Sequence, residues 1–288
     1  MPKTAVVIDE EKLAPPHIAA APADAHERSQ LAELWRFREL LYFLAWRDVK
    51  VRYKQAAFGA AWAIIQPLAT MIIFSFFFSR VAKVPSAGLP YSLFCYSALV
   101  PWVYFASTLS QAGNSLVGNS SLITKIYFPR VLLPAASAFG GLLDFCVGSS
   151  FLAVLMLYYR IAPTWHLIFW PLAVLGMVIV SLGISLLLAA MNVRYRDVKH
   201  VIPFMIQLGL FVTPVLYPAN ADFLPPKLRL VLAFNPLSGV MEAFRATLFP
   251  HQNPDFRLMG LSLGISLLVL LIGSIYFRRA ERTFADII

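Results

Sequence analysis

Long stretches without a charged residue decide what this chain can fold into. No Asp, Glu, Lys or Arg occurs in five stretches: 55–79, 84–124, 161–193, 201–221 and 258–277. A sixth apolar run, between Arg130 and Arg160, is interrupted only by Asp144. A helix needs about 20 residues to cross a hydrocarbon core of about 30 Å, so each run can span a membrane. With 59% hydrophobic and 14% charged residues, the chain lies outside the class of soluble globular proteins.

The six runs predict an all-α polytopic membrane protein. Only helices and closed barrels satisfy every backbone group in lipid, and the period-two alternation of barrel strands is absent. We expect a transmembrane domain over 57–277 with six spans at about 57–79, 92–113, 132–158, 166–190, 201–217 and 258–277. Prolines within or beside the runs predict kinks in a packed bundle: Pro67, Pro101, Pro134, Pro171, Pro203 and Pro214.

The basic residues predict the orientation. An even number of spans places both termini on one side of the membrane. On that side fourteen Lys and Arg residues flank the spans, against seven on the other side. The positive-inside rule therefore predicts that both termini are cytoplasmic. Anionic lipid beside these residues accounts for the net charge of +9, and nucleic acid is not expected as a partner.

The cytoplasmic segments at the two ends of the chain differ in pattern. Residues 1–28, rich in Ala and Pro, predict a flexible tail, and 278–288 form a second short tail. Within 29–56, apolar residues recur at helical spacing from Leu34 to Leu44. This pattern predicts an amphipathic helix in the headgroup layer, with a small soluble N-terminal domain as the alternative.

The segment 218–250, on the predicted outer side, is too long for a turn and too apolar for a free loop. Asn235 followed by Pro236 and an apolar stripe predicts a helix that begins there. A second short helix is expected over 226–233. We expect two re-entrant helices that dip into the outer leaflet before the last span.

Sequence patterns for catalysis are largely missing. No Gly is followed by Lys, so the chain has no G-x-x-x-x-G-K-[ST] loop and cannot hydrolyse ATP by that route. There is no H-E-x-x-H and no His/Cys cluster at metal-ligand spacing. The stretch HQNPD at 251–255 loosely resembles an acyltransferase motif, but an outer loop explains it. We expect a non-enzymatic chain without a metal or cofactor of its own, in which Cys95 and Cys146 are small core residues.

Asp144 is the one carboxylate inside a predicted span. An unpaired charge in lipid costs several kcal/mol, so such a residue suggests a functional site by default. A proton relay needs a chain of such groups, and no basic residue shares this span. Two interpretations stay open: a polar contact to a neighbouring helix or a water-filled cavity, or direct involvement in transport.

Basic residues gather where the amphipathic helix meets the first span: Arg47, Lys50, Arg52 and Lys54. Arg47, Lys50 and Lys54 are three and four residues apart and share one helical face. They could hold an anionic, pyrophosphate-linked lipid head on the cytoplasmic leaflet. The alternative is ordinary positive-inside anchoring.

Aromatic residues make up 14% of the chain. Aromatic belts at membrane interfaces are the ordinary explanation. The alternative is that some line a pathway, where flat rings meet the apolar faces of passing sugars. The candidates for a channel are Phe74, Phe78, Trp102, Tyr104, Phe211 and Tyr217.

The sequence SLITKIYFPR, at 121–130, is a short basic and aromatic interruption between two apolar runs. In a helix, Ile123, Ile126 and Tyr127 would form an apolar ridge that ends at Pro129. Lys125 and Arg130 supply charge. The alternative is a plain basic loop between two spans.

Several stretches together resemble the membrane subunits of ABC transporters of the polysaccharide and polyol-phosphate export type, which export O-antigen, capsule and teichoic acid. The matching stretches, spread over residues 31–250, are RDVKVRYKQ at 47–55, GAAW at 59–62, Gln66-Pro67, Pro101-Trp102, NSLVGNSSLITKIYFPR at 114–130, NVRYRD at 192–197, TPVLYP at 213–218, Asn235-Pro236 and EAFR at 242–245. The combination is much more specific than any one of them.

The resemblance implies a homodimer of six-helix subunits around a channel in the bacterial inner membrane. Each subunit would dock to a separate cytoplasmic ATPase, which binds ATP and Mg, and the substrate would be a lipid-linked glycan. The cytoplasmic loop 114–130 would hold the coupling helix, with Ile123, Lys125, Ile126, Tyr127, Phe128 and Arg130 as contacts. Arg194, Arg196 and Asp197 would form a second, smaller contact. Glu242 and Arg245, a possible i,i+3 pair, would belong to an outer gate.

Other functions are weighed against this one. A drug or small-lipid exporter of related architecture is the alternative within transport. A membrane-embedded acyl- or glycosyltransferase would need a polar catalytic cluster, which the sequence does not show. A self-contained channel or proton-driven carrier would need more intramembrane charge than Asp144.

Overall fold

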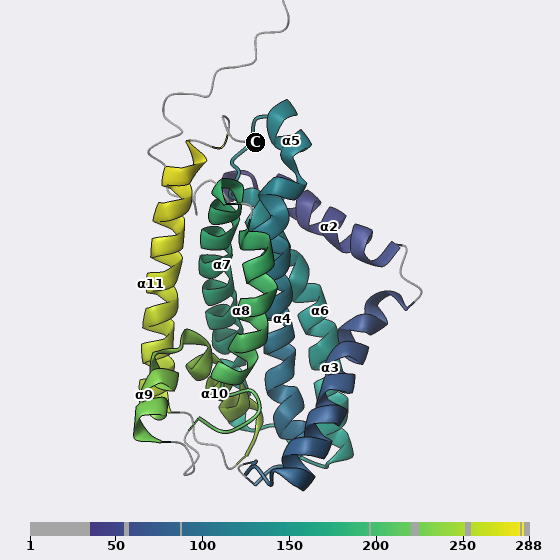
Figure 1. Cartoon of the computed structure of the whole chain (residues 1–288). Coiled ribbons are helices and arrows are strands. Elements are labelled where there is room, and N and C mark those ends of the chain that lie inside the picture. The colour runs from purple at the N-terminus through teal and green to yellow at the C-terminus, as the bar shows by residue number, and fades with distance from the viewer. Residues whose placement is uncertain are drawn as a thin grey trace, which may run out of the picture.

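The computed structural model describes residues 35–54, 58–86, 88–195, 197–219, 225–250, 255–282 and 284. Within these ranges the regular elements are all helices, gathered into one bundle (Figure 1). The predicted tail 1–28, the first part of the predicted amphipathic helix and most of HQNPD lie outside the described residues. The chain is an all-α polytopic membrane protein, as the apolar runs predict.

Five helical segments are long and apolar enough to cross a membrane. The first, Gly59–Val81, consists of the 3-10 turn η3 (Gly59–Ala61), α3 (Trp62–Phe74) and the π-helical η4 (Ser75–Val81). The others are α4 (Tyr91–Gly118), α6 (Leu132–Tyr158), η5 (Trp165–Phe169) continued by α7 (Trp170–Arg194), and α11 (Phe256–Glu281). The predicted third span, 132–158, coincides with α6.

The predicted fifth span, 201–217, is shorter in the structure. Here α8 covers Val198–Val212, only 15 residues, and Thr213 is extended. At 1.5 Å per residue α8 is about 22 Å long, less than a hydrocarbon core. The described residues therefore do not confirm six full-length spans, because the segment from Thr213 to Pro218 leaves the helix.

The core of the bundle is formed by α4 and α7. α4 packs against α3, α6, α7 and α8, while α7 also packs against α11. The first and last spans are largely exposed and lie on opposite sides of the bundle (Figure 1). Cys95 on α4 is buried as predicted, but Cys146 on α6 is exposed, so the prediction of a core position is wrong for Cys146. The Cys146 side chain faces outward from α6, where lipid accepts a small thiol.

Helix α2 (Arg38–Lys54) runs across the spans, at the end of the bundle that carries α5 (Ser120–Lys125) (Figure 1). Leu44 and Val49 are buried, and α2 packs against α6 where Gly140 admits the backbone of Ala45. The opposite side of α2 exposes aromatic rings, including Tyr42 and Phe43. The apolar stripe that predicted a headgroup-layer helix therefore contacts protein, while aromatic residues face outward.

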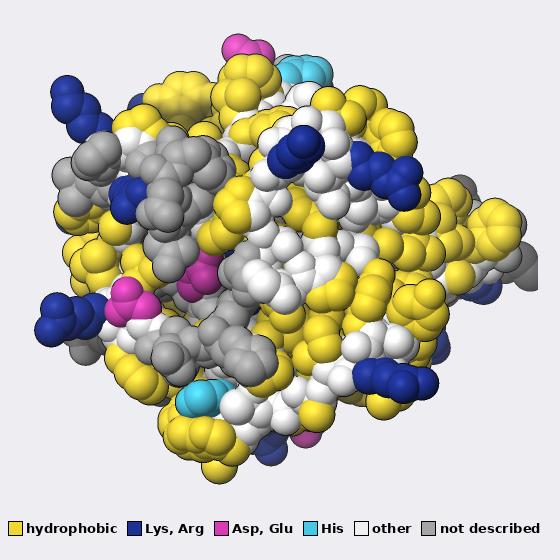
Figure 2. All heavy atoms as spheres, turned by 90° about the horizontal axis from the view of Figure 1, so that it is seen from below, with side chains coloured by type: hydrophobic (Ala, Val, Ile, Leu, Met, Phe, Trp, Pro, Cys, Tyr) yellow, Lys and Arg dark blue, Asp and Glu magenta, His cyan; other side chains and the backbone are white. Residues whose placement is uncertain are grey.

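Two short helices, α9 (Pro226–Phe234) and α10 (Pro236–Leu248), lie at the opposite end of the bundle (Figure 1). The predicted helix start at Asn235 is confirmed, because the side-chain oxygen of Asn235 accepts a hydrogen bond from the Leu237 N–H at 3.0 Å. Nearly all of α10 is buried. Seen from this end, Lys and Arg side chains lie mostly toward the rim (Figure 2).

Glycines allow α7 and α11 to approach closely. A Cβ atom on Gly183 would lie 2.7 Å from the backbone N of Leu270, and one on Gly273 would collide with the carbonyl oxygen of Gly183. In membranes, small residues at such crossings let helices associate through close backbone packing. This contact therefore holds the last span onto the bundle.

The substitution Gly273→Val should separate α11 from α7, because backbone atoms cannot yield to a new side chain. We expect a loss of about 1–3 kcal/mol or more in folding free energy, as in overpacked cores. The measurement is the monodisperse fraction after detergent extraction, as a function of temperature. Gly264→Val on the same helix is the matched control, since a Cβ atom there meets nothing within 4 Å. Equal behaviour of the two variants would contradict the proposed packing.

Candidate coupling and gate sites

The predicted coupling helix is shorter than expected. α5 ends at Lys125, and Ile126 is extended with φ −133° and ψ 132°. The prediction that Pro129 ends this helix is therefore wrong. Ile126 and Tyr127 are still 57% and 62% exposed, but they follow the helix rather than forming a ridge along it with Ile123. Ile123 is half-buried against the apolar cluster beside α2.

The far end of the loop is fastened to the chain itself. Phe128, predicted to contact the ATPase, is only 6% exposed. The Arg130 guanidinium donates a hydrogen bond to the Glu281 carbonyl at 2.8 Å, and the Arg130 N–H donates to Glu281 Oε1 at 3.2 Å. The guanidinium also lies 5.7 Å from the centre of the Phe284 ring. Phe128 and Arg130 thus anchor the loop to the end of α11, and among the predicted ATPase contacts of the loop Lys125, Ile126 and Tyr127 are exposed.

The second predicted contact, at 192–197, is divided between the interior and the surface. Arg194 and Asp197 are exposed, and Arg196 lies outside the described residues. Asn192 is buried, and its amide donates to the Gly113 carbonyl at 2.9 Å and to Asn114 Oδ1 at 3.2 Å. The end of α7 is therefore held against the C-terminal end of α4.

The four basic residues predicted to hold a lipid head separate into two pairs. Lys50 and Lys54 are exposed, and the Lys50 ammonium lies 5.7 Å from the centre of the Trp46 ring. Arg47 and Arg52 are half-buried and donate to acceptors within the protein. Only the lysines of this group therefore face outward and remain suitable for anionic lipid.

Asp144 makes a polar contact to a neighbouring helix, which is the first of the two interpretations that the sequence left open. Its Oδ2 accepts a hydrogen bond from Arg52 Nη1, and Arg52 Nη2 donates to Gln111 Oε1. The two charges therefore form an ion pair at the junction of α2, α4 and α6. The partner of Asp144 is 92 residues away in sequence, so spacing within the span could not reveal it.

The predicted pair on α10 is confirmed: Arg245 Nη1 lies 3.6 Å from Glu242 Oε1. Arg245 is fully buried, with its guanidinium carbon 3.7 Å from the centre of the Phe94 ring. It donates to the carbonyl oxygens of Pro214 at 2.9 Å and Val215 at 2.7 Å. Arg245 therefore fixes α10 to both α4 and the segment that follows α8.

A second set of contacts holds the same segment. Glu242 Oε1 accepts a hydrogen bond from the Ala219 N–H at 3.1 Å. The Asn235 amide donates to Thr213 Oγ1 at 3.1 Å. The stretches TPVLYP and EAFR, far apart in sequence, thus form one structural unit at this end of the bundle. The sequence predicted the Glu242–Arg245 pair but gave no signal for the carbonyl acceptors.

The aromatic residues predicted for a channel occupy different environments. Trp102 and Tyr104 are buried within the subunit, where the Tyr104 hydroxyl donates to the Ala138 carbonyl at 3.1 Å. Phe74 and Phe78 are half-buried and contact each other edge to face at 5.7 Å. Phe211 is exposed on α8, and its carbonyl accepts from the half-buried Tyr217 hydroxyl at 2.9 Å. Trp102 and Tyr104 therefore pack helices together in this subunit.

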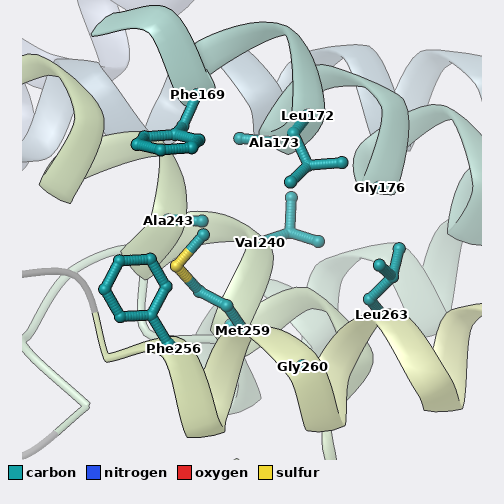
Figure 3. Close-up of a pocket in the computed structure, with 11 residues that line it drawn as sticks. Phe169, Leu172, Ala173, Gly176, Val240, Ala243, Phe256, Met259, Gly260 and Leu263 are labelled. Atoms are coloured by element: carbon teal, nitrogen blue, oxygen red, sulfur yellow. The ribbon is translucent and has the colours of Figure 1, made fainter. Parts of the chain in front are cut away.

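An apolar cavity of about 300 Å³ lies between α7, α10 and α11 (Figure 3). Phe169, Val240, Phe256, Met259 and Leu263 contribute to its wall. Unpaired polar groups are costly in such surroundings, so a glycan rich in hydroxyls does not suit this cavity. Within the described ranges, no group of three or more His, Cys, Asp or Glu could hold a metal ion.

Comparison with known proteins identifies the family of this chain. Residues 39–249 match the family described as ABC-2 type transporter. This chain belongs to that family. The matched range begins in α2 and ends just after α10, so it includes the loop with α5, the Arg52–Asp144 pair and the Arg245 contacts.

Relatives of this ABC-2 family member come from bacterial export systems. The O-antigen export system permease protein RfbA of Myxococcus xanthus is 29% identical over 254 residues, 88% of this chain and 97% of the relative. RfbA of Klebsiella pneumoniae is 30% identical over 254 residues, 87% of this chain and 95% of the relative. The polysialic acid transport protein KpsM of Escherichia coli is 22% identical over 243 residues, 82% of this chain and 91% of the relative.

Proposed function

We propose that this chain is the channel-forming transmembrane subunit of an ATP-driven exporter of lipid-linked polysaccharide, of O-antigen or capsule type, in a bacterial inner membrane. The observation that supports it most is the similarity, over nearly the full length, to O-antigen export permeases. Both termini would be cytoplasmic, so that α2 and α5 face the cytoplasm and α9 and α10 the outer leaflet. Transport, rather than catalysis, is the role of this subunit.

A homodimer would complete the channel. α8 exposes Phe204, Leu208 and Phe211, and α3 with η4 exposes Ile72 and Phe76. Exposed apolar faces in a membrane protein contact lipid or another helix, and a second copy placed on these faces would enclose a pathway between two subunits. The apolar lining of the cavity between α7, α10 and α11, which does not suit a glycan, supports a pathway between subunits rather than through that cavity.

Two copies of a separate cytoplasmic ABC ATPase, with ATP and Mg, would supply the energy. Lys125, Ile126 and Tyr127 are exposed one after another in the loop, and a short apolar and basic projection suits a cleft on a partner. The rest of the loop is held by Phe128 and Arg130, so a force on the projection would reach α11 and α2. Arg194 and Asp197 would add a second contact.

The double substitution Ile126→Asp and Tyr127→Asp tests this docking. Burying two carboxylates in the contact should weaken ATPase binding by about thirtyfold or more, the loss that a hot-spot residue gives. The measurement is co-purification of the ATPase with the tagged membrane subunit at matched expression. Ser121→Asp adds a charge to an already polar, exposed position of the same loop and should retain the ATPase. An intact complex in the double variant would contradict the docking proposal.

A further inference from the structure

The arginines of α2 link this helix to three other parts of the bundle. Arg47 Nη2 donates a hydrogen bond to Asn119 Oδ1 at 3.0 Å and another to Asp48 Oδ1 at 2.8 Å. Asn119 caps the start of α5, and its amide donates to the Ser115 carbonyl at 2.8 Å. The Arg47 contact therefore joins α2 to the residue at which α4 ends and α5 begins.

Arg52, five residues after Arg47 on α2, reaches into the bundle. Its guanidinium bridges two membrane-spanning helices, since it donates to Asp144 on α6 and to Gln111 on α4. The side chains of Arg52 and Asp144 are only 24% and 16% exposed. A charged pair inside a helical bundle is costly to break, because each partner would be left in an apolar environment without its counter-charge.

The two attachment points are five residues apart, about 7.5 Å along the helix axis. Between them Val49 packs on α6, where a Cβ atom on Gly140 would lie 3.6 Å from Val49 Cγ2. The same Cβ atom would lie 3.4 Å from the carbonyl oxygen of Ala45, two residues before Arg47. A helix held at two separated points and along one side cannot swivel freely about either point. A displacement of Asn119 would therefore move Arg52 as well.

We propose that α2 transmits the movement of the coupling loop into the membrane, with Arg47 as its contact to the loop and the Arg52–Asp144–Gln111 cluster as its contact to the spans. Arg52 and Asp144 are then positioning residues rather than a lipid-binding arginine and a substrate-binding carboxylate. The inference rests on the proposed function, because the movement begins with an ATPase docked on the loop. Lys50 and Lys54 keep the contact with anionic lipid.

The test uses the membrane subunit assembled with its ATPase in proteoliposomes. The probe is a tritium-labelled glycan on a polyprenyl pyrophosphate, and export and phosphate release are measured together. Asp144→Asn and Arg52→Gln should each keep the ATPase bound and hydrolysing, while export per ATP falls about tenfold, within the range of coupling between linked sites. The swapped double variant, Arg52→Asp with Asp144→Arg, should recover most of the wild-type export per ATP hydrolysed, because the ion pair is restored with its charges exchanged.

Arg279→Gln is the control for loss of a cationic side chain at the same end of the bundle, since Arg279 is exposed at the end of α11. This variant should export as much glycan per ATP hydrolysed as the wild type. Single variants that export at the wild-type ratio would overturn the inference, and so would a fall in export matched by an equal fall in hydrolysis or folded protein. If the wild-type complex exports no glycan, the proposed function fails instead, which separates the two outcomes.

Discussion

Replacing Arg245 with methionine should destabilise the α10 end of the bundle by about 3–6 kcal/mol, because the fully buried guanidinium loses two charge-assisted hydrogen bonds, each of about 1.5–3 kcal/mol. Methionine has a similar length but no donor, so the carbonyl oxygens of Pro214 and Val215 lose their hydrogen bonds. Glu242 loses its cation and the Phe94 ring loses the guanidinium stacked on it. The expected result is release of α10 from the segment that follows α8.

The measurement is thermal unfolding of the detergent-solubilised protein, followed by size-exclusion profile, together with protease sensitivity of the segment 213–219. Arg245→Lys should recover only part of the loss, because one ammonium cannot reproduce a planar fork that reaches two carbonyls and stacks on a ring. Arg257→Met is the matched control, since Arg257 is exposed on the first turn of α11. Equal stability of the Arg245 and Arg257 variants would show that the buried contacts are not needed.

Local chemistry made much of the fold predictable from the sequence. The apolar runs gave the membrane class and the approximate positions of the long helices, because span length follows from bilayer thickness. Asn235 followed by Pro236 gave the start of α10, and i,i+3 spacing gave the Glu242–Arg245 pair. Each of these predictions needed only residues within one turn or one span of each other.

Contacts between distant segments could not be predicted in the same way. Arg52 and Asp144 are 92 residues apart, and Arg130 and Glu281 are 151 apart. A basic residue beside a span looks the same in sequence whether it faces lipid phosphate or a carboxylate on another helix. The sequence did not show that α8 ends at Val212, because the apolar run continues past Thr213 although the backbone leaves the helix there.

Helix α4 connects the two ends of the molecule. Gln111 near its C-terminal end contacts Arg52, and the Phe94 ring near its N-terminal end lies against Arg245. α4 is also the most buried of the candidate spans. A closely packed helix resists bending, so displacements at one end are carried to the other. Under the proposed function, α4 would therefore give a direct mechanical path from the loop with α5 to helices α9 and α10.

The chain reconstituted alone in vesicles should export no glycan, with or without ATP. No Gly is followed by Lys anywhere in its 288 residues, so it cannot form the phosphate-binding loop of an ATPase. Proton-driven transport would need a series of ionisable groups across the membrane. Within the described spans, Asp144 is already paired with Arg52, which leaves it a poor member of such a relay.

Adding the partner ATPase should convert the idle vesicles into exporting ones, which is the largest effect expected for this protein. The measurement is the transfer of a tritium-labelled lipid-linked glycan against its gradient. The control is the same ATPase with the lysine of its phosphate-binding loop replaced, which keeps the docked complex but removes hydrolysis. Export by the chain alone, or with the inactive ATPase, would contradict the proposal, because no other source of energy is present in the vesicles. Export only with the active ATPase would place the power source outside this chain.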